Sequence, residues 1–278
     1  MTTAVEPKSH TLEINGLALH YVEYPSPAAG AIPLVMLHGL TSAWGGWRRI
    51  AEHFALRYRV IALDQRGHGD SQWAGPDGYG TAAYLSDFEQ FVDRLGLERF
   101  ILVGQSMGGH HTIAYTARHP ERVVCALAND IPPALKYEPS DHAQDFPGGA
   151  HRTFATVEDW LAPWRVWEPL TPEWARQLSA RELLRAVDGG FQPKHDPNAV
   201  LHWQPADLWD EARTIVRPIL FIRGGQSDVL DAQTLMDMDL AIEPARSITL
   251  EQASHSTFYD MEHEWLAVAD AFFAAHAR

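Results

Sequence analysis

The stretch Phe100-Ile-Leu-Val-Gly-Gln-Ser-Met-Gly-Gly109 decides how the rest of the chain is interpreted. Its first residues form a short apolar run without alternation, which is typical of a strand covered on both faces. Gly104 to Gly108 then match the pattern G-x-S-x-G, and a helical pattern follows at once over 107–118. In such a strand–turn–helix setting a serine hydroxyl is raised above the sheet edge, where the N-terminus of the next helix favours negative charge. We therefore identify Ser106 as a candidate nucleophile.

Other short apolar runs upstream and downstream also have the character of strands. Asn15-Gly16 separates the first two, and Asn-Gly is a strong signal for a two-residue hairpin. We expect strands at 10–14, 18–23, 32–37, 58–63, 99–103, 123–128, 218–222 and 245–250. We expect helices at 47–54, 83–95, 107–118, 234–241 and 262–276. Strands that alternate with helices predict a mainly parallel sheet with helices on both faces, joined by right-handed crossovers.

Residues 132–209 interrupt this alternation. Proline, tryptophan and acidic residues become frequent there, and the buried-strand runs disappear. The segment has helical patterns at 157–164 and 172–186, and it is too long for a structureless loop in a compact domain. We predict an α/β core made of 1–131 and 210–278, with an inserted helical cap at 132–209 that lies over the sheet edge.

Composition limits the possible partners and compartments. The 278 residues carry a formal net charge of −14 without a basic patch, which argues against nucleic acid or an anionic membrane as a partner. Cys125 is the one cysteine, so an internal disulfide is impossible, and no Cys/His spacing resembles a structural zinc site. We expect a small-molecule substrate, no metal and no cofactor. The oligomeric state, monomer or homodimer, is not predicted.

The chain carries no recognisable targeting signal in its first residues. They lack a basic region followed by an apolar run, so we predict no signal peptide. No uninterrupted apolar stretch approaches the roughly 20 residues that a membrane-spanning helix needs. These features together predict a cytoplasmic protein.

A His-Gly pair stands at the end of the first expected parallel strand, in Leu37-His38-Gly39-Leu40. A loop at this place can direct a main-chain N–H group into the site. We predict that the N–H groups of Leu40 and Met107 form an oxyanion hole that stabilises charge on a substrate oxygen. We interpret His38 itself as a structural loop residue.

A late histidine supplies a candidate base. His255 follows the last expected strand after a short loop and precedes the final helix, whereas His263 and His276 fall on that helix. A serine needs an adjacent base to become nucleophilic near neutral pH, and histidine suits this task. We therefore predict that His255 is the general base for Ser106.

These motifs, together with Asp64-Gln-Arg-Gly-His-Gly-Asp-Ser71, resemble the α/β-hydrolase superfamily in its serine-nucleophile branch. The resemblance covers residues 12 to 273, and the cap is its least matched part. It implies the α/β-hydrolase fold and a catalytic triad. It also implies that the loop with Asp64 and Arg66 holds the scaffold, so neither is a catalytic candidate.

The triad acid has two candidates. Most of the family places it after the strand at 218–222, where this chain has Ser227, with Asp228 one residue further on. The alternative is Asp130, at the end of the strand at 123–128. A subgroup resembling (E)-2-(acetamidomethylene)succinate hydrolase takes its acid from there, and this chain shares the subgroup's early Asp-x-x-Pro and late Gly-x-x-Ser patterns. We favour Asp130 and keep Asp228 as the alternative; either would orient the imidazole.

A serine at this turn predicts acyl-enzyme chemistry on a small to moderate ester, lactone or activated amide, and it argues against the dehalogenase and epoxide hydrolase branches, which use aspartate. Carbon–carbon hydrolases of ring-fission products are an alternative. They usually carry a Ser-Gly-Pro-Gly loop and a tryptophan after the histidine, where this chain has Leu40-Thr-Ser-Ala43 and Ser256. A non-hydrolytic member of the fold, a ligand receptor or a cofactor-free oxygenase, is a further alternative.

The sequence does not name the substrate, because the cap decides it. We take Trp160, Trp164 and Arg165 as cap candidates for substrate contact. Each tryptophan can also be core of the cap, and an arginine on an exposed helix face is the commoner arrangement. Arginines can pair with a substrate carboxylate.

Overall fold

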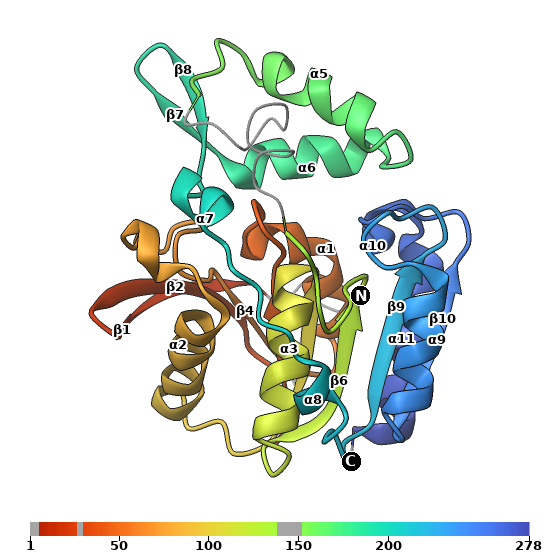
Figure 1. Cartoon of the computed structure of the whole chain (residues 1–278). Coiled ribbons are helices and arrows are strands. Elements are labelled where there is room, and N and C mark those ends of the chain that lie inside the picture. Colours follow the sequence, from red (N-terminus) through yellow and green to blue (C-terminus); the bar gives the residue numbers. More distant parts are fainter. Residues whose placement is uncertain (1–5, 27–29, 138–151, 278) are drawn as a thin grey trace.

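A computed structural model describes residues 6–26, 30–137 and 152–277, and an eight-stranded sheet organises the chain (Figure 1). The strand order is β1-β2-β4-β3-β5-β6-β9-β10. The strands are β1 (Lys8–Ile14), β2 (Leu17–Tyr24), β3 (Pro33–Leu37), β4 (Arg59–Leu63), β5 (Phe100–Gln105), β6 (Val123–Asn129), β9 (Ile219–Gly224) and β10 (Ala245–Leu250). From β4 to β10 all neighbours are parallel, and β2 is antiparallel to both of its neighbours. The predicted mainly parallel sheet is confirmed.

The first hairpin turns at the predicted dipeptide. Asn15 and Gly16 both have positive φ, 51° and 76°, and Ile14 pairs with Leu17 on either side of them. Two consecutive residues of positive φ match the right-handed twist of the flanking strands.

Helices cover both faces of the sheet, because successive residues of each central strand point to opposite sides. In β5, Phe100 and Leu102 join one buried core, while Ile101 and Val103 join the other. The first core includes residues of α2 (Thr81–Arg94), α3 (Met107–Arg118), α8 (Trp209–Ala212) and α9 (Ala232–Ala241). The second includes residues of α1 (Arg48–Phe54), α10 (Thr257–Asp260) and α11 (Glu262–His276). The short 3-10 helices η1 (Trp44–Trp47) and η2 (Pro76–Gly78) lie in loops.

The segment between β6 and β9 leaves the sheet after β6 and returns close to its starting point. There Leu208 N donates to Pro133 O at 3.0 Å, so the two ends of the segment lie side by side. It carries α5 (Val157–Trp167), α6 (Glu173–Leu183), β7 (Leu184–Val187), β8 (Gly190–Pro193) and α7 (Pro197–Leu201). Figure 1 shows α5 and α6 stacked beyond one end of the sheet. The division of the chain into a core and a cap with the bounds given above stays a prediction.

One helix of this segment is shorter in the structure than the sequence predicted. The pattern at 172–186 predicted a single helix, but α6 ends at Leu183 and the chain continues into the β7–β8 hairpin. Gly189 and Gly190 turn this hairpin with φ values of 82° and 145°, which only glycine adopts readily. These glycines reverse the chain, so 184–187 pair with 190–193 and do not continue the helix.

The single cysteine lies in the sheet. Cys125 is fully buried in β6, and burial raises the pKa of its thiol to about 12. Such a thiol stays protonated and unreactive near neutral pH. Among the described helices, none is both long and apolar enough to cross a membrane.

Candidate active site

Ser106 occupies a strained turn between β5 and α3. Its φ of 50° and ψ of −117° lie outside the regions that L-residues favour, a conformation that costs about 1–3 kcal/mol and that functional sites retain. Flanking glycines make the turn possible. A Cβ on Gly104 would lie 2.2 Å from Gly108 O, and one on Gly108 would lie 2.2 Å from Leu37 O. The hydroxyl of Ser106 is thereby held at the carboxyl end of the sheet.

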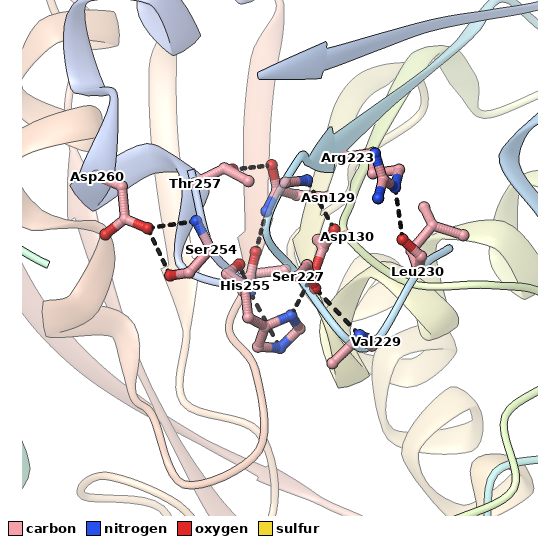
Figure 2. A network of polar contacts seen from close by, with 12 residues as sticks. Asn129, Asp130, Arg223, Ser227, Val229, Leu230, Ser254, His255, Thr257 and Asp260 are labelled. Atoms are coloured by element: carbon pink, nitrogen blue, oxygen red, sulfur yellow. Dashed lines mark hydrogen bonds and ion pairs between the residues drawn. The ribbon is translucent and has the colours of Figure 1, made fainter. Parts of the chain in front are cut away.

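His255 and Asp130 lie within ion-pair distance of each other at the carboxyl end of the sheet. The imidazole Nδ1 lies 2.6 Å from Asp130 Oδ2, and this carboxylate is fully buried. Asp130 follows β6 directly and has a positive φ of 49°. Its Oδ1 accepts from Gly224 N at 2.9 Å, and its Oδ2 also accepts from Ser227 Oγ at 2.5 Å (Figure 2). Since a carboxylate only accepts, Nδ1 carries the proton in this pair.

Of the two acid candidates, the structure brings Asp130 to the imidazole and leaves Asp228 apart. Asp228 is exposed and makes no hydrogen bond to His255 within the described ranges. Ser227, at the position where most of the family carries its acid, donates to Asp130 instead. The two strand ends meet because β6 and β9 are neighbours in the sheet.

The other ring nitrogen of His255 faces the serine turn. Gln105, which directly precedes Ser106, places its Nε2 3.5 Å from His255 Nε2 and donates to His255 O at 3.1 Å. The imidazole therefore lies between the carboxylate of Asp130 and the turn that carries Ser106. The role of His255 as the base for Ser106 stays a prediction.

The charge around His255 favours its protonated form. Burial opposes a charge on the ring, but the hydrogen bond and negative charge of Asp130, with smaller contributions from Glu168 and Asp228, raise the pKa of His255. The pKa of Glu168 is itself raised, chiefly by burial, although the hydrogen bonds from Ser256 and Thr171 and the charge of His255 oppose that rise.

The loop after β3 lies against the serine. A Cβ on Gly39 would be only 3.3 Å from Ser106 Cβ, so the next N–H group, that of Leu40, belongs to the edge of the site. Met107 is the first residue of α3, and N–H groups at this position have no partner within their own helix. Neither N–H group donates to another described residue. Their role as an oxyanion hole stays a prediction.

His38 fits the structural interpretation. It is buried, its Nδ1–H donates to Gly39 O at 2.8 Å and its Nε2 accepts from Gln65 N at 3.0 Å. Burial lowers the pKa of its imidazole, so the ring is neutral near pH 7.

The loop after β4 is held by hydrogen bonds around Asp64. Its carboxylate accepts from Trp44 N at 2.6 Å, from His20 Nδ1 at 2.8 Å and from Asp70 N at 3.0 Å. His20, Asp64 and Asp70 lie close enough together to hold a metal ion, but these contacts already account for the position of Asp64.

Arg66 serves the same loop. It forms two hydrogen bonds of 2.6 Å with Asp87 on α2 and donates to Gly78 O at 2.9 Å. The contacts are those of a scaffold.

Two of the three cap candidates line a cavity. Trp160 and Trp164 face a space of about 20 Å³ between α5, α6 and α10, which is enough for one water molecule. Arg165 does not face it. Its guanidinium pairs with Glu158 and, at 2.8 Å, with Glu173 on the surface. Substrate contact by any of the three stays a prediction.

Three residues near the site, Gln105, Asn129 and Glu168, were not predicted from the sequence. Gln105 and Asn129 directly precede Ser106 and Asp130, and this adjacency was the one available signal. Nothing in the sequence places Glu168 near His255, because 87 residues separate them and only the fold brings them together.

The chain resembles known hydrolases over most of its length. The family described as "alpha/beta hydrolase fold" matches residues 32–261. The 3-hydroxybutyrate-oligomer hydrolase of Cupriavidus necator is 30% identical over 91% of this chain and 92% of its own length. The 2-(acetamidomethylene)succinate hydrolase of Mesorhizobium japonicum is 28% identical over 74% of this chain and 75% of its own length.

Solved structures agree on the fold. The crystal structure of E-2-(acetamidomethylene)succinate hydrolase superposes with a TM-score of 0.87 and 24% identity, covering 97% of this chain and 100% of that one. Other relatives include a 2-hydroxymuconate semialdehyde hydrolase and epoxide hydrolases, so the relatives share hydrolysis and not one substrate. The chain belongs to the α/β-hydrolase fold family and is a hydrolase of that family.

Proposed function

We propose that this chain is a serine hydrolase that cleaves a small to moderate carboxylic ester, lactone or activated amide through an acyl-enzyme intermediate. Ser106 is the nucleophile, His255 the general base and Asp130 the acid that orients the base. One observation carries the proposal: the His255 ring has Asp130 2.6 Å from Nδ1 and the residue before Ser106 3.5 Å from Nε2.

The positions of the protons on His255 suit acylation of Ser106. Because Asp130 accepts from Nδ1, the neutral imidazole has its lone pair on Nε2, the nitrogen that faces the serine turn. As Ser106 Oγ attacks the carbonyl carbon, its proton passes to Nε2. The buried carboxylate of Asp130 stabilises the resulting imidazolium.

The leaving group and the water use the same base. The imidazolium returns its proton to the leaving oxygen or nitrogen, and the acyl group stays on Ser106 Oγ. His255 then removes a proton from water, which attacks the acyl carbon. The bond from that carbon to Ser106 Oγ breaks, the imidazolium returns the proton to Oγ, and the acid leaves. The N–H groups of Leu40 and Met107 hold the carbonyl oxygen while it bears negative charge, the contribution for which such donors are placed in advance.

Ester substrates are the first class to examine. The relative from Cupriavidus necator is named for hydrolysing oligomers of 3-hydroxybutyrate, a hydroxy acid whose units condense through ester bonds. The relative from Mesorhizobium japonicum is named for 2-(acetamidomethylene)succinate, which carries an N-acyl enamine. Both bonds join an acyl carbon to a heteroatom, as the proposed attack by Ser106 requires.

Covalent labelling tests the proposal. A fluorophosphonate is expected to label the wild-type chain at Ser106 and to leave folded Ser106→Ala unlabelled. Wild type is expected to hydrolyse members of a panel of p-nitrophenyl esters of increasing length, lactones, 3-hydroxybutyrate dimer and N-acyl enamines. A folded wild-type chain that is neither labelled nor active on this panel, but cleaves a ring-fission product, would make the carbon–carbon hydrolases the correct class.

A further inference from the structure

Two buried amides connect the segments that carry the proposed triad. Gln105 directly precedes Ser106, and Asn129 directly precedes Asp130. Gln105 is 6% exposed and Asn129 is fully buried. Polar groups without partners are costly in such places, so the hydrogen bonds of these amides decide how they are oriented.

The orientation of Asn129 is set by donors on the segment after His255. Trp265 Nε1 lies 2.8 Å and Thr257 Oγ1 2.6 Å from Asn129 Oδ1, and both residues are fully buried. An indole N–H group can only donate, so the atom that it meets must be the oxygen of the amide. The nitrogen of Asn129 therefore points the other way.

The hydrogen bonds continue from Asn129 through Gln105 to the imidazole. Asn129 Nδ2 donates to Gln105 Oε1, which leaves Gln105 Nε2 as the donor toward His255. One proton of this nitrogen goes to His255 O at 3.1 Å, and the other side meets His255 Nε2 at 3.5 Å. A donor placed there is compatible with a lone pair on Nε2 and not with a proton. Figure 2 shows Asn129 between Thr257 and the residues around His255.

We propose that Asn129 and Gln105 are positioning residues for the base. The hydrogen-bonded chain that runs from Trp265 and Thr257 through these two amides to His255, here called the amide relay, holds the imidazole in the tautomer whose Nε2 accepts a proton. This inference rests on the proposed function. The relay acts on the reaction through His255.

The relay also opposes the charges around the ring. Asp130, Glu168 and Asp228 are the ionisable groups that act on His255, and as anions all three favour the imidazolium. An amide N–H group near Nε2 favours the neutral ring instead. Loss of the relay is therefore expected to raise the pKa at which the base is lost, which moves the acidic limb of kcat/KM to higher pH.

The experiment compares matched variants of the full chain on one p-nitrophenyl ester. Gln105→Met keeps the length of the side chain and removes both its donor and the oxygen that accepts from Asn129 Nδ2. Thr257→Val keeps the shape and removes the hydroxyl. Gln105→Met is expected to lower kcat by about 10- to 100-fold, with a smaller change in KM, because misplaced catalytic groups cost rate at this scale. Thr257→Val leaves Trp265 Nε1 on Asn129 Oδ1 and is expected to lower kcat by a smaller factor. Both are expected to move the acidic limb upward.

Two control variants separate positioning from general loss of stability. Thr257→Ser keeps the hydroxyl. It is expected to retain nearly the wild-type kcat and the wild-type acidic limb of kcat/KM. Ser71→Ala deletes another buried hydrogen bond, the one that Ser71 Oγ donates to Asp64 O at 2.6 Å, and is expected to lower stability in urea without moving the limb.

The outcomes distinguish the two proposals. Activity retained by folded Ser106→Ala would overturn the proposed function, and the relay with it. If wild type is labelled and active while folded Gln105→Met and Thr257→Val keep the wild-type kcat and acidic limb, the relay alone is wrong. If Gln105→Met does not fold, the comparison of Thr257→Val with Thr257→Ser decides. Equal kcat values and equal acidic limbs of kcat/KM in these two variants contradict the relay. A lower kcat in Thr257→Val that Thr257→Ser does not show supports it.

Discussion

The imidazole of His255 donates from Nδ1 to Asp130 Oδ2 across 2.6 Å, although Asp130 follows β6 and not β9. Ser227, at the position after β9, donates to the same oxygen at 2.5 Å. Because β6 and β9 are adjacent and parallel, a carboxylate at either strand end can reach the same place. The serine after β9 thus supports a carboxylate that comes from the neighbouring strand.

Replacing each carboxylate by an amide tests whether Asp130 or Asp228 orients His255. Asp130→Asn replaces the acceptor of the Nδ1 proton by an amide that can also donate, so it permits the unproductive tautomer. We expect kcat to fall by about 10³- to 10⁴-fold in steady-state ester hydrolysis. Asp228→Asn, which changes an exposed side chain, is the matched control and is expected to retain nearly wild-type kcat. A larger loss in Asp228→Asn would mean that Asp130 is not the acid.

The pH profile tests the charge beside the base. The pKa of His255 is raised above its ordinary value, because the contributions of Asp130, Glu168 and Asp228 exceed the opposing effect of burial. In the proposed mechanism the neutral ring takes the proton of Ser106, so kcat/KM is expected to fall as the pH drops through this raised pKa. Glu168→Gln removes one anion and is expected to move that fall to lower pH. Glu173→Gln, at the exposed ion pair with Arg165, should leave the profile in place; identical profiles for Glu168→Gln and wild type would contradict the account.

Buried neutral histidines predict loss of stability in mild acid. Burial lowers the pKa values of His38, His68 and His111, and it lowers that of His110 to about 4. Below the unfolded value of about 6.5 the unfolded chain binds more protons than the folded one, so the free energy of unfolding decreases as the pH falls from 6.5 toward 4. His255, with a raised pKa, gains its stabilising contribution as the pH falls toward 6.5 and adds no further change below that pH.

Urea unfolding at a series of pH values measures this effect. For His110 alone, a pKa of about 4 instead of 6.5 corresponds to roughly 3 kcal/mol when the change is complete. Carboxyl groups with lowered pKa values, such as Glu23 and Glu173, titrate below about 4.5, so the interval above it reports mainly the histidines. Stability that stays flat across that interval would show that these imidazoles are not buried as described.

A glycine pair tests the support of the loop that carries His255. A Cβ on Gly224 would lie 2.1 Å from Ser254 O, so Gly224→Ala must displace the residue next to the base. We expect kcat to fall by about tenfold or more, since small shifts of catalytic groups are costly. Gly75 has φ −74° and open space at its Cβ, so Gly75→Ala is expected to be neutral in kcat and neutral or slightly stabilising in urea. Equal kcat values for the two variants would contradict the close packing at Gly224.

Most of the fold could be predicted from the sequence, because its central strands are buried on both faces. Such strands appear as short continuous apolar runs, and all eight were placed within two residues of their observed ends. The candidate nucleophile Ser106 and the loops that carry Gly39 and His255 could also be predicted, from short motifs at strand ends. Such motifs depend on local backbone geometry, as the positive φ of Ser106 shows.

The remaining features depend on packing between distant segments. The choice between Asp130 and Asp228 requires knowing which strand end lies nearer to His255, and sequence spacing does not carry that information. The β7–β8 hairpin depends on positive φ values at Gly189 and Gly190, which a helical pattern hides. The amide relay joins residues up to 160 positions apart, from Gln105 to Trp265, so only the assembled core reveals it.

Mass spectrometry of the chain, quenched during turnover of a p-nitrophenyl ester, shows whether Ser106 carries an acyl group. We expect an acyl group on the peptide that contains Ser106 in wild type, and none in Ser106→Ala or His255→Ala, because the hydroxyl must be both present and deprotonated to be acylated. Hydrolysis at a wild-type rate by either folded variant would contradict the account.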